Sequence, residues 1–426
     1  MIVTMERPMT KLNALILVLF FLLLGACAFA DETTAAPLSF DVKLDKVLQS
    51  WDGVYDWAQA WAGSIPGAGR DGAPLILITT QKENNKSDDY YLGVNTLENA
   101  DFGATWTGPI PHAELEPHPQ PDGTIKGLCD FTSGWHAPTG RFLITGHTVY
   151  YANGRLAPRP YPRTTAYAVF DPKANAWLPW RELDLPDKDK FFDSGSGMCQ
   201  WVIEPDGTLL LPVYHMPKSE AKSECYSVTI LRCAFDGETL RYLGHGDELK
   251  LGVPRGFCEP SLTWFRGRYY LTLRNDVKGY VTSGTDGQHF DSVRPWTFDD
   301  GAELGSYNTM QHWATHSDGL FLVYTRRGAN NDHVIRNRAP LFIAQVDPGK
   351  LCVIRATERA IVPDRGASLG NFGVANVSEK ETWVTVGECM YSPECEKRGS
   401  NGTVFAARLV WSRPNALVTG KQPLPR

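Results

Sequence analysis

The sequence has no run of basic residues, no sustained helical periodicity and, beyond residue 24, no second long hydrophobic stretch. Without a basic run, and with a formal net charge of −6, nucleic acid is excluded as an expected partner. Without a second apolar run, no segment of the mature chain is expected to span a membrane. The lack of helical periodicity, together with 39 glycines, 29 prolines and 11% aromatic residues, predicts an all-β chain of short strands joined by many turns.

The first thirty residues have the pattern of a secretory signal. Arg7 and Lys11 precede the apolar run 15–24, and a segment of small residues follows it. Two cleavage sites are open: after Ala30, which gives a soluble protein, or before Cys27, where Leu-Gly-Ala-Cys resembles a bacterial lipobox. We therefore expect an extracytoplasmic bacterial protein that is secreted, periplasmic or an outer-membrane lipoprotein. Its only membrane contact would be a lipid on Cys27.

One hairpin pattern is especially clear. Two runs of aromatic and β-branched residues, 261–265 and 269–273, flank a turn at Gly267. Because the chain reverses at this glycine, Glu259 before the first run and Arg274 after the second should lie at the same edge. The sequence therefore predicts that a carboxylate and a guanidinium meet there.

The same pattern recurs five more times, and its turns fall about 50 to 70 residues apart, somewhat longer than the roughly 40 to 50 residues of common propeller repeats. The other copies run from Ser64 to Gln81, from Cys129 to His147, from Cys199 to His215, from Gln311 to Arg327 and from Phe372 to Glu388. A third strand is expected after each hairpin, at residues 90–97, 165–170, 227–235, 279–283, 339–346 and 403–411.

These repeats predict a six-bladed β-propeller with four-stranded antiparallel blades over residues 38–412, followed by a tail at 413–426. The last blade lacks an outer strand of its own. Residues 38–48 would supply it, which closes the ring and hides its edges.

In a propeller, the same end of every inner hairpin faces one funnel, so polar residues at that end form a candidate site. A mixture of carboxylates, imidazoles and guanidinia is the usual composition of a binding or catalytic centre, although pairs such as Glu259 with Arg274 would also satisfy one another. The predicted rim residues are Asp130, His136, His147, Gln200, His215, Glu259, Arg274, Asp276, Asn308, Gln311, His312, Arg326, Arg327 and Glu388.

Two groups of residues in and near this set have specific chemistry. Guanidinium groups from two neighbouring blades suit a carboxylate or sulfate on a ligand; they are Arg274, Arg326, Arg327, Arg336 and Arg338. The rim histidines match no metal-ligand spacing, so no metal is assigned to them, and a structural calcium or a zinc ion is left open.

The cysteines predict at most one disulfide. Cys225 and Cys233 lie on one expected strand, where eight residues span roughly 26 Å and forbid a bond. Cys389 and Cys395 flank a loop at Pro393 and are the best candidate pair. The cysteines of the inner strands, Cys129, Cys199 and Cys258, are expected to be small buried packing residues.

Residues Asn99–Trp106 resemble the Asp-box of sialidases, a turn with the pattern Ser-x-Asp-x-Gly-x-Thr-Trp, with Asn99 in place of the serine. Residues 283–290 resemble a degenerate second copy. In that family the box joins the two outer strands of a blade, on the face away from the active site, and both copies fall at such a joint here. The resemblance implies a sialidase-like propeller diverged from true sialidases. The aspartate is expected to tie the turn through local hydrogen bonds.

The resemblance extends to residues that would carry chemistry. Glu259, followed by Arg274, is similar to the sialidase segment that supplies the carboxylate behind the tyrosine nucleophile and one arginine of the triad that clamps the sugar acid. Arg338 lies where another triad arginine is expected. Glu388 resembles the last supporting glutamate of the family.

The general acid would lie at Asp88 or Asp89, in the loop before the first Asp-box. Two departures from the family are clear. The Arg-Ile-Pro start of blade one reads Ser-Ile-Pro at 64–66, so the first triad arginine is absent, and the Tyr-Ser segment of blade six reads Ala-Asn-Val-Ser at 375–378, so the nucleophile is absent. The tyrosines that would have to replace it are Tyr280, Tyr307 or Tyr324.

Three functions follow, all on an acidic or sulfated glycan. The first is a glycoside hydrolase with Glu259 as base or nucleophile support, Asp88 or Asp89 as acid, and arginines on the anion. The second is a polysaccharide lyase in which His147 or His215 abstracts a proton beside a uronate carboxyl. The third is a glycan-binding propeller without catalysis. The expected substrate-binding residues are Arg274, Asp276, Arg326, Arg327, Arg338, Asp130, His136, Gln200, Gln311, His312 and Glu388.

Overall fold

The computed structural model describes residues 37–85, 89–158, 161–223 and 225–418. The predicted signal at 1–30, with its lipobox Cys27, and one of the two candidate acids, Asp88, lie outside these residues. Residues 38–418 belong to one compact unit, which is almost entirely strand and turn. Within the described ranges, no helix is long and apolar enough to cross a membrane.

The largest sheet is built from both ends of the described chain. Its eight strands pair in the order β1 (Phe40–Gln49), β30 (Thr403–Trp411), β29 (Glu381–Gly387), β28 (Phe372–Asn376), β2 (Tyr55–Ile65), β3 (Leu75–Asn84), β4 (Tyr91–Asn99) and β5 (Thr107–Pro111). Only the parallel pair Ala60 and Phe372 joins β2 to β28, so the sheet consists of two four-stranded antiparallel groups.

Four further sheets lie between β5 and β28 in the described chain. The second contains β6 (His118–Pro119), β7 (Ile125–His136), β8 (Arg141–Ala152), β9 (Arg155–Leu156), β10 (Thr165–Asp171), β11 (Ala176–Trp177) and β12 (Arg181–Glu182). The third contains β13 (Asp193–Gly195), β14 (Val202–Ile203), β15 (Leu209–Met216), β16 (Cys225–Phe235), β17 (Leu240–His245) and β18 (Arg255–Gly256).

The fourth sheet contains β19 (Cys258–Phe265), β20 (Arg268–Arg274), β21 (Gly279–Gly284) and β22 (Arg294–Pro295). The fifth contains β23 (His312–His316), β24 (Gly319–Tyr324), β25 (Leu341–Asp347), β26 (Cys352–Val353) and β27 (Arg359–Val362). The helical segments are short: α2 (Glu394–Lys397) and the 3-10 turns Arg70–Gly72, Ala113–Leu115, Lys218–Glu220, Ile335–Asn337 and Arg355–Thr357.

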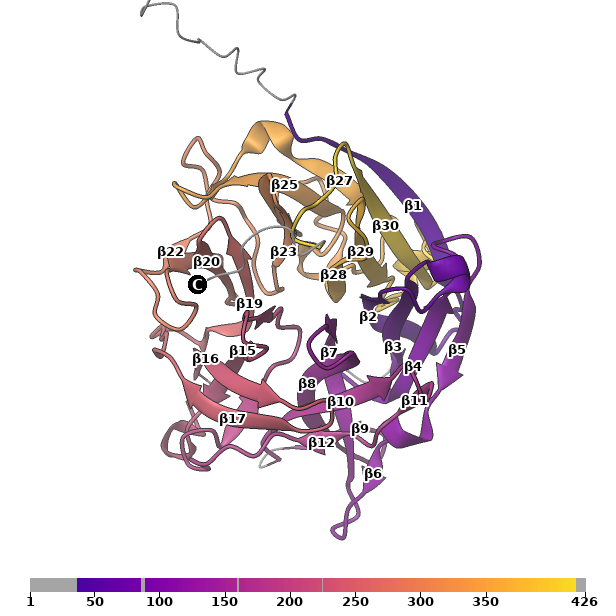
Figure 1. The fold of residues 1–426 in the computed structure, drawn as a ribbon, viewed down its shortest axis with the longest axis vertical. Coiled ribbons are helices and arrows are strands. Elements are labelled where there is room, and N and C mark those ends of the chain that lie inside the picture. Colours follow the sequence, from indigo (N-terminus) through magenta and orange to yellow (C-terminus); the bar gives the residue numbers. More distant parts are fainter. Residues whose placement is uncertain (1–36, 86–88, 159–160, 224, 419–426) are drawn as a thin grey trace, which may run out of the picture. The chain divides into compact units, whose positions relative to one another are not determined.

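The sheets are arranged radially, with β2, β7, β19, β23 and β28 nearest the middle (Figure 1). These inner strands contact one another in turn: β19 with β23, β23 with β28, β28 with β2, and β2 with β7. The apolar cores lie between successive sheets; one joins Leu143 and Val169 of the second sheet to Leu211 and Leu231 of the third. This arrangement is consistent with the predicted β-propeller.

The clearest predicted hairpin is confirmed. Phe265 pairs with Arg268, so the turn has two residues, and its central residues Arg266 and Gly267 have φ values of 48° and 84°. Two positive φ angles in succession are the geometry of a type I′ turn, which matches the twist of the flanking strands. The six expected third strands are also observed within two residues at each end, as β4, β10, β16, β21, β25 and β30.

Two hairpins begin elsewhere than predicted. In the first, β2 starts at Tyr55, and Ser64 lies near its far end opposite Ile76, so the Ser-Ile-Pro match to the sialidase arginine motif was made at the wrong end of the strand. In the third, residues 193–195 rather than Cys199 pair with the end of β15, and Ser194 lies opposite His215. In both cases the pairing register determines which residues lie at the rim end of the hairpin, and local sequence does not set that register.

The outer strand of the last group comes from the start of the described chain, as predicted. β1 pairs antiparallel with β30 from Phe40 opposite Trp411 to Gln49 opposite Thr403. The predicted tail is held by the fold as far as it is described: Asn415 is buried, and its side chain donates to the carbonyl oxygen of Thr315 at 2.9 Å.

The predicted disulfide is wrong. Cys389 and Cys395 are both free and buried. They belong to different clusters, since Cys389 packs with Tyr91 whereas Cys395 packs with Met390 and donates to the carbonyl oxygen of Gly366 at 3.3 Å. The other cysteine predictions are confirmed: Cys225 and Cys233 share β16 unbonded, and the inner-strand cysteines are buried.

The turn that resembles an Asp-box joins β4 to β5 and is tied by its own side chains. Asp101 accepts from the backbone N–H of Thr105 at 2.9 Å and from its hydroxyl at 2.5 Å, while Asn99 donates to the carbonyl oxygen of Thr105 at 2.6 Å. The second turn lies between β21 and β22, where Asp286 accepts from two backbone N–H groups. Both turns are therefore elements of the fold that their own side chains stabilise locally.

Candidate active site

Three inner strands carry an irregularity at a polar residue. Gln59, Asp130 and Glu259 have φ values of 57°, 58° and 44°, and the strand register shifts beside each of them. Residues other than glycine rarely adopt this region, and such strain gathers at functional sites. A bulge re-aims the side chain it carries, so these three polar side chains turn away from the usual alternation of the strand.

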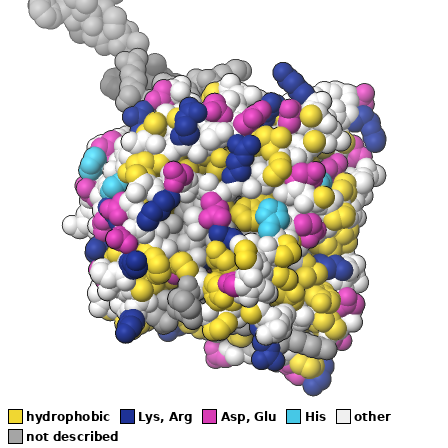
Figure 2. All heavy atoms as spheres, turned by 90° about the horizontal axis from the view of Figure 1, so that it is seen from below, with side chains coloured by type: hydrophobic (Ala, Val, Ile, Leu, Met, Phe, Trp, Pro, Cys, Tyr) yellow, Lys and Arg dark blue, Asp and Glu magenta, His cyan; other side chains and the backbone are white. Residues whose placement is uncertain are grey.

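A cavity of about 640 Å³ opens beside these kinks. It is bordered by the β7–β8 hairpin, by the loop before β10, by the ends of β19 and β20, and by the segments around Asn308 and Arg338. The face of the molecule shown in Figure 2 carries acidic and basic side chains intermixed.

Nine of the residues predicted from the sequence line this cavity; they are Asp89, Asp130, His147, Glu259, Arg274, Asp276, Asn308, Arg336 and Arg338. The edge predicted from the hairpin at Gly267 is present: Arg274 forms an ion pair with Glu259, and both side chains are less than one-tenth exposed. The other end of the Arg274 guanidinium donates to Asn308 at 2.7 Å and lies 3.5 Å from Asp276. Glu259 therefore fixes the position of the Arg274 guanidinium.

Arg338 lies next to this pair but has a different environment. Its Nε and Nη2 donate to the carbonyl oxygen of Asn308 at 3.2 and 2.5 Å, and no described carboxylate lies within ion-pair distance of it. Burial, and then repulsion from Arg274 and Arg336, lowers the pKa of the Arg338 guanidinium. Gly370 makes room for the side chain, because a Cβ there would lie 2.2 Å from Cδ of Arg338. The cavity wall thus holds a buried cation without a described anionic partner.

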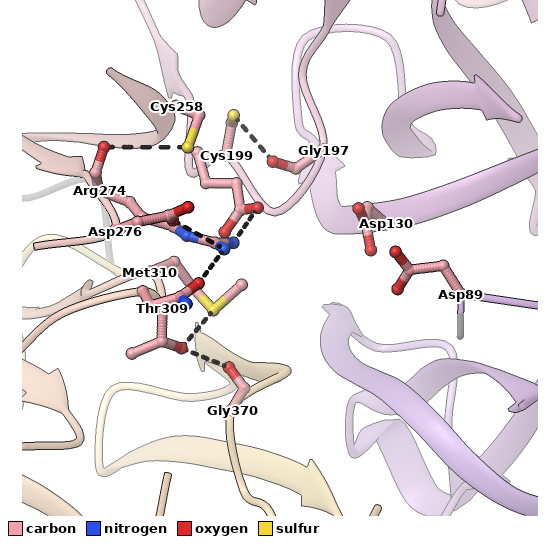
Figure 3. Close-up of polar contacts among 12 residues, drawn as sticks. Asp89, Asp130, Gly197, Cys199, Cys258, Arg274, Asp276, Thr309, Met310 and Gly370 are labelled. Carbon is pink, nitrogen blue, oxygen red and sulfur yellow. Dashed lines mark hydrogen bonds and ion pairs between the residues drawn. The ribbon is translucent and has the colours of Figure 1, made fainter. Parts of the chain in front are cut away.

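The opposite wall is acidic. Figure 3 shows the carboxylates of Asp89 and Asp130 pointing toward one another, across the cavity from Arg274 and Asp276. Asp89 accepts from the hydroxyl of Tyr91 at 3.3 Å. Burial by itself would raise the pKa of Asp130, but the hydrogen bond from His147 and the positive charge of Arg163 outweigh it and hold that pKa below its ordinary value.

A tyrosine backed by buried carboxylates completes the lining. Tyr391 lines the cavity and its hydroxyl donates to Glu83 at 3.3 Å. Burial, with the nearby charges of Asp56 and Asp89, raises the pKa of Glu83 well above its ordinary value. Asp56, which accepts from Asn85 at 2.6 Å, has its pKa raised to about 6, mainly by burial.

The other predicted residues that the structure describes are not part of this lining, and each makes contacts elsewhere. Contrary to the expected rim position, His136 lies beside the hairpin turn at the other end of β7, where it contacts the carbonyl oxygen of Gly207. His215 packs on Phe191 and donates to the carbonyl oxygen of Lys190, and burial lowers its pKa to about 4.

Three polar residues close the middle of the ring instead. His312 lies between the rings of Trp61 and Phe372, and burial lowers its pKa to about 3. Gln200 makes two hydrogen bonds with the backbone of Trp313, and Gln311 is buried with Thr272 and Ser306 among its partners. These three side chains therefore make contacts within the ring and do not line the cavity.

The last three predicted residues make structural contacts. Arg326 forms a bidentate pair with Glu358, with bonds of 2.8 and 2.6 Å. Arg327 stacks on the ring of Tyr307 and donates to a backbone carbonyl. Glu388 accepts from the backbone N–H groups of residues 401 and 403 and lies 3.5 Å from Arg365.

The replacement tyrosines considered from the sequence, Tyr280, Tyr307 and Tyr324, are likewise absent from the described lining. The lining instead includes groups that sequence reasoning missed, among them Arg163, Arg255, Asp193 and Tyr391. Arg163 comes from a loop, donates to Asp193 at 3.1 Å and lies over the ring of Tyr226. No local pattern marks a loop arginine as a site residue, so only the fold could find it.

Comparison with solved structures supports the architecture. The chain is similar to the Trypanosoma rangeli sialidase, with 12% identity, a TM-score of 0.54, and coverage of 88% of this chain and 60% of that one. It is also similar to the K499G mutant of the NanB sialidase from Streptococcus pneumoniae, with 10% identity, a TM-score of 0.54, and coverage of 85% and 70%. The Hadza microbial sialidase Hz136 is also similar, with 13% identity, a TM-score of 0.53, and coverage of 83% of this chain and 66% of that one.

The fold is sialidase-like. At these identities the likeness concerns the fold alone, and the chain spans about 60% of the length of the trypanosomal structure. No family model matches the chain. A search of curated proteins found no match either. Chemistry must therefore be argued from the cavity.

Proposed function

We propose that this protein is a glycoside hydrolase that removes an anionic sugar, carrying a carboxylate or a sulfate, from a glycan. The observation that carries the proposal is Arg338. This guanidinium is 5% exposed, is repelled by Arg274 and Arg336, and faces a cavity of about 640 Å³. A carboxylate or sulfate group bound in the cavity would supply the missing partner, and guanidinium groups recognise such anions with paired hydrogen bonds.

The opposite wall supplies the catalytic groups in this proposal. Asp89 acts as the general acid on the leaving oxygen, the role expected for Asp88 or Asp89 from the sequence. Tyr391 acts as the nucleophile, and Glu83, whose raised pKa makes it a stronger proton acceptor than an ordinary carboxylate, takes its proton. Glu259 positions Arg274 rather than acting as a base, because its carboxylate is engaged by that guanidinium.

The sialidase-like fold supports a glycan as the substrate. One of the similar structures is the Trypanosoma rangeli sialidase in complex with sialic acid, with 11% identity and a TM-score of 0.52. The proposal includes a ring of six four-stranded blades, and export by residues 1–30 to the periplasm, the medium or the outer membrane, where such glycans occur.

The hydrolase is favoured over the lyase by the state of the two candidate bases. His215 lies outside the cavity lining. His147 lines it, but both ring nitrogens contact protein oxygens, those of Thr148 and Asp130, at 2.9 and 3.0 Å. Neither histidine is therefore placed to take a proton from a substrate without first giving up a partner.

The test is turnover on matched pairs of sialylated, uronate-containing and sulfated oligosaccharides and their carboxyl-reduced or desulfated counterparts, with products identified by mass. We expect release of one anionic sugar by the wild type and loss of release in Arg338→Met. Arg355→Met is the control, because this arginine pairs with Asp300 on the surface, outside the cavity. Equal cleavage of the charged glycan and its neutral counterpart would refute the arginine contact.

A further inference from the structure

A cysteine, an aspartate and a histidine meet on the cavity wall. One ligand atom each of Cys129, Asp130 and His147 lies within 4.8 Å of the other two, and all three residues line the cavity. The β7–β8 hairpin brings them together, since Cys129 pairs with His147 across the strands and Asp130 occupies the bulge. We propose that these three side chains bind a zinc ion. This site does not depend on the proposed hydrolysis of glycans.

The orientation of His147 is the first argument. Its Nδ1 lies 2.9 Å from the carbonyl oxygen of Thr148. A carbonyl oxygen only accepts hydrogen bonds, so Nδ1 carries the hydrogen. In the neutral ring Nε2 then presents a lone pair, and it faces Oδ2 of Asp130 at 3.0 Å. Two acceptors at this distance require a cation between them, either a proton or a metal ion.

The spacing suits a metal ion. Bonds from zinc to imidazole nitrogen and carboxylate oxygen are about 2.0 to 2.2 Å long. Two such ligand atoms 3.0 Å apart, as Nε2 of His147 and Oδ2 of Asp130 are, subtend an angle of roughly 90° at a shared ion. A movement of a few tenths of an ångström in either side chain would open this to the tetrahedral angle.

Hydrogen bonds from Gln59 already hold the proposed ligands in place. Oε1 of Gln59 accepts from the backbone N–H of Asp130 at 2.8 Å, which fixes the direction of the amide. Its Nε2 therefore donates to Oδ1 of Asp130 at 2.6 Å and lies 3.5 Å from Sγ of Cys129. Outer hydrogen bonds of this kind orient metal ligands. Gly197 confines His147 from the other side, because a Cβ there would lie 2.6 Å from Cδ2 of the ring.

The donor set selects the metal. A thiolate, an imidazole and a carboxylate suit zinc, whereas calcium takes six to eight oxygen ligands. Three protein ligands leave the fourth tetrahedral position open, as in zinc sites that bind water or substrate. Here that position would face the cavity, where Arg274 and Arg338 form part of the lining.

The experiment is a zinc titration of the purified, chelator-stripped protein, with bound metal counted by mass spectrometry and affinity measured by calorimetry. We expect one zinc ion per chain and an affinity at least tenfold lower in Cys129→Ser and in His147→Gln. Cys233→Ser should bind like the wild type, because this cysteine is fully buried in β16 and is no part of the cavity lining. Cobalt(II) alone should give a thiolate-to-metal charge-transfer band that Cys129→Ser lacks.

A stripped wild-type protein that takes up no zinc, or a cobalt complex without the thiolate band, would overturn the proposal and leave a shared proton between His147 and Asp130. The wild-type spectrum decides this even if a variant fails to fold, which melting curves would reveal. Zinc uptake without turnover of any glycan would uphold the metal site and refute the hydrolase. Turnover by protein that binds no zinc would do the reverse.

Discussion

Replacing Arg338 with methionine should leave the empty protein at least as stable as the wild type while removing its response to anions. Burial, and then repulsion from two neighbouring arginines, lowers the pKa of this guanidinium. A basic group whose pKa is lower in the folded state destabilises the fold wherever it remains protonated. Neutral pH lies far below the pKa of any arginine, so the penalty is present under all ordinary conditions.

The size of the effect follows from opposing terms. The substitution removes a charge whose burial costs several kcal/mol, and methionine fills a similar apolar volume. It also removes the hydrogen bonds to the carbonyl oxygen of Asn308. Leaving that buried acceptor without a hydrogen-bond donor costs about 1 to 3 kcal/mol. We therefore expect the free energy of unfolding of Arg338→Met to be about 0 to 3 kcal/mol higher than that of the wild type.

The assay is denaturant unfolding with and without inorganic sulfate, at ionic strength matched with sodium chloride. Sulfate at one hundred times its dissociation constant should stabilise the wild type by about 2.7 kcal/mol. It should not stabilise Arg338→Met, whereas Arg355→Met should respond like the wild type. If Arg338→Met loses more than about 2 kcal/mol in the absence of sulfate and still responds to it, Arg338 is a structural residue and the argument from its missing partner fails.

Three further outcomes follow from the cavity. Glu259→Gln should lower the free energy of unfolding by about 3 to 5 kcal/mol, because it removes the buried ionic partner of Arg274 and leaves only the more exposed Asp276 at 3.5 Å; a loss no greater than that of the surface control Asp300→Asn in urea unfolding would contradict this. The pKa of Asp56 is raised to about 6, mainly by burial. An acid with a raised pKa destabilises the fold above that pKa, so this carboxyl should add about 2 kcal/mol of stability as the pH falls from 7 to 4, and a pH series should show that Asp56→Asn lacks this gain. Tyr391→Phe should lower kcat about a hundredfold or more with unchanged binding of the glycan by calorimetry, and full turnover would exclude Tyr391 as the nucleophile.

The sequence predicted the parts of the fold that local chemistry determines. The turn at Gly267 needs only two residues that tolerate positive φ, and the pairing of Glu259 with Arg274 follows from it. The outer strands could also be predicted, because turns rich in Asp and Gly mark their ends. β1 could be assigned to the four-stranded group of β28, β29 and β30 because an open edge needed a partner.

The register of the other hairpins could not be predicted, since it depends on packing between sheets. Ser64 seemed to begin the first hairpin, but the strand begins at Tyr55 and brings Gln59 to the site instead. His312 and Gln200 are residue types common in active sites, but His312 packs on Phe372 and Gln200 accepts from the backbone N–H of Trp313. A polar residue on an inner strand faces either the cavity or the ring centre, and the choice depends on kinks visible only in three dimensions.

The most direct test of the central claim is turnover of the anionic glycan in water enriched with the heavy oxygen isotope, with products analysed by mass. A glycoside hydrolase must place one solvent oxygen in the released sugar, and we predict this label in the wild type and no release in Arg338→Met. An unsaturated product that absorbs in the near ultraviolet and carries no solvent oxygen would show a lyase. Binding of the glycan without any product would show a propeller that holds the sugar, and either result would contradict the hydrolase.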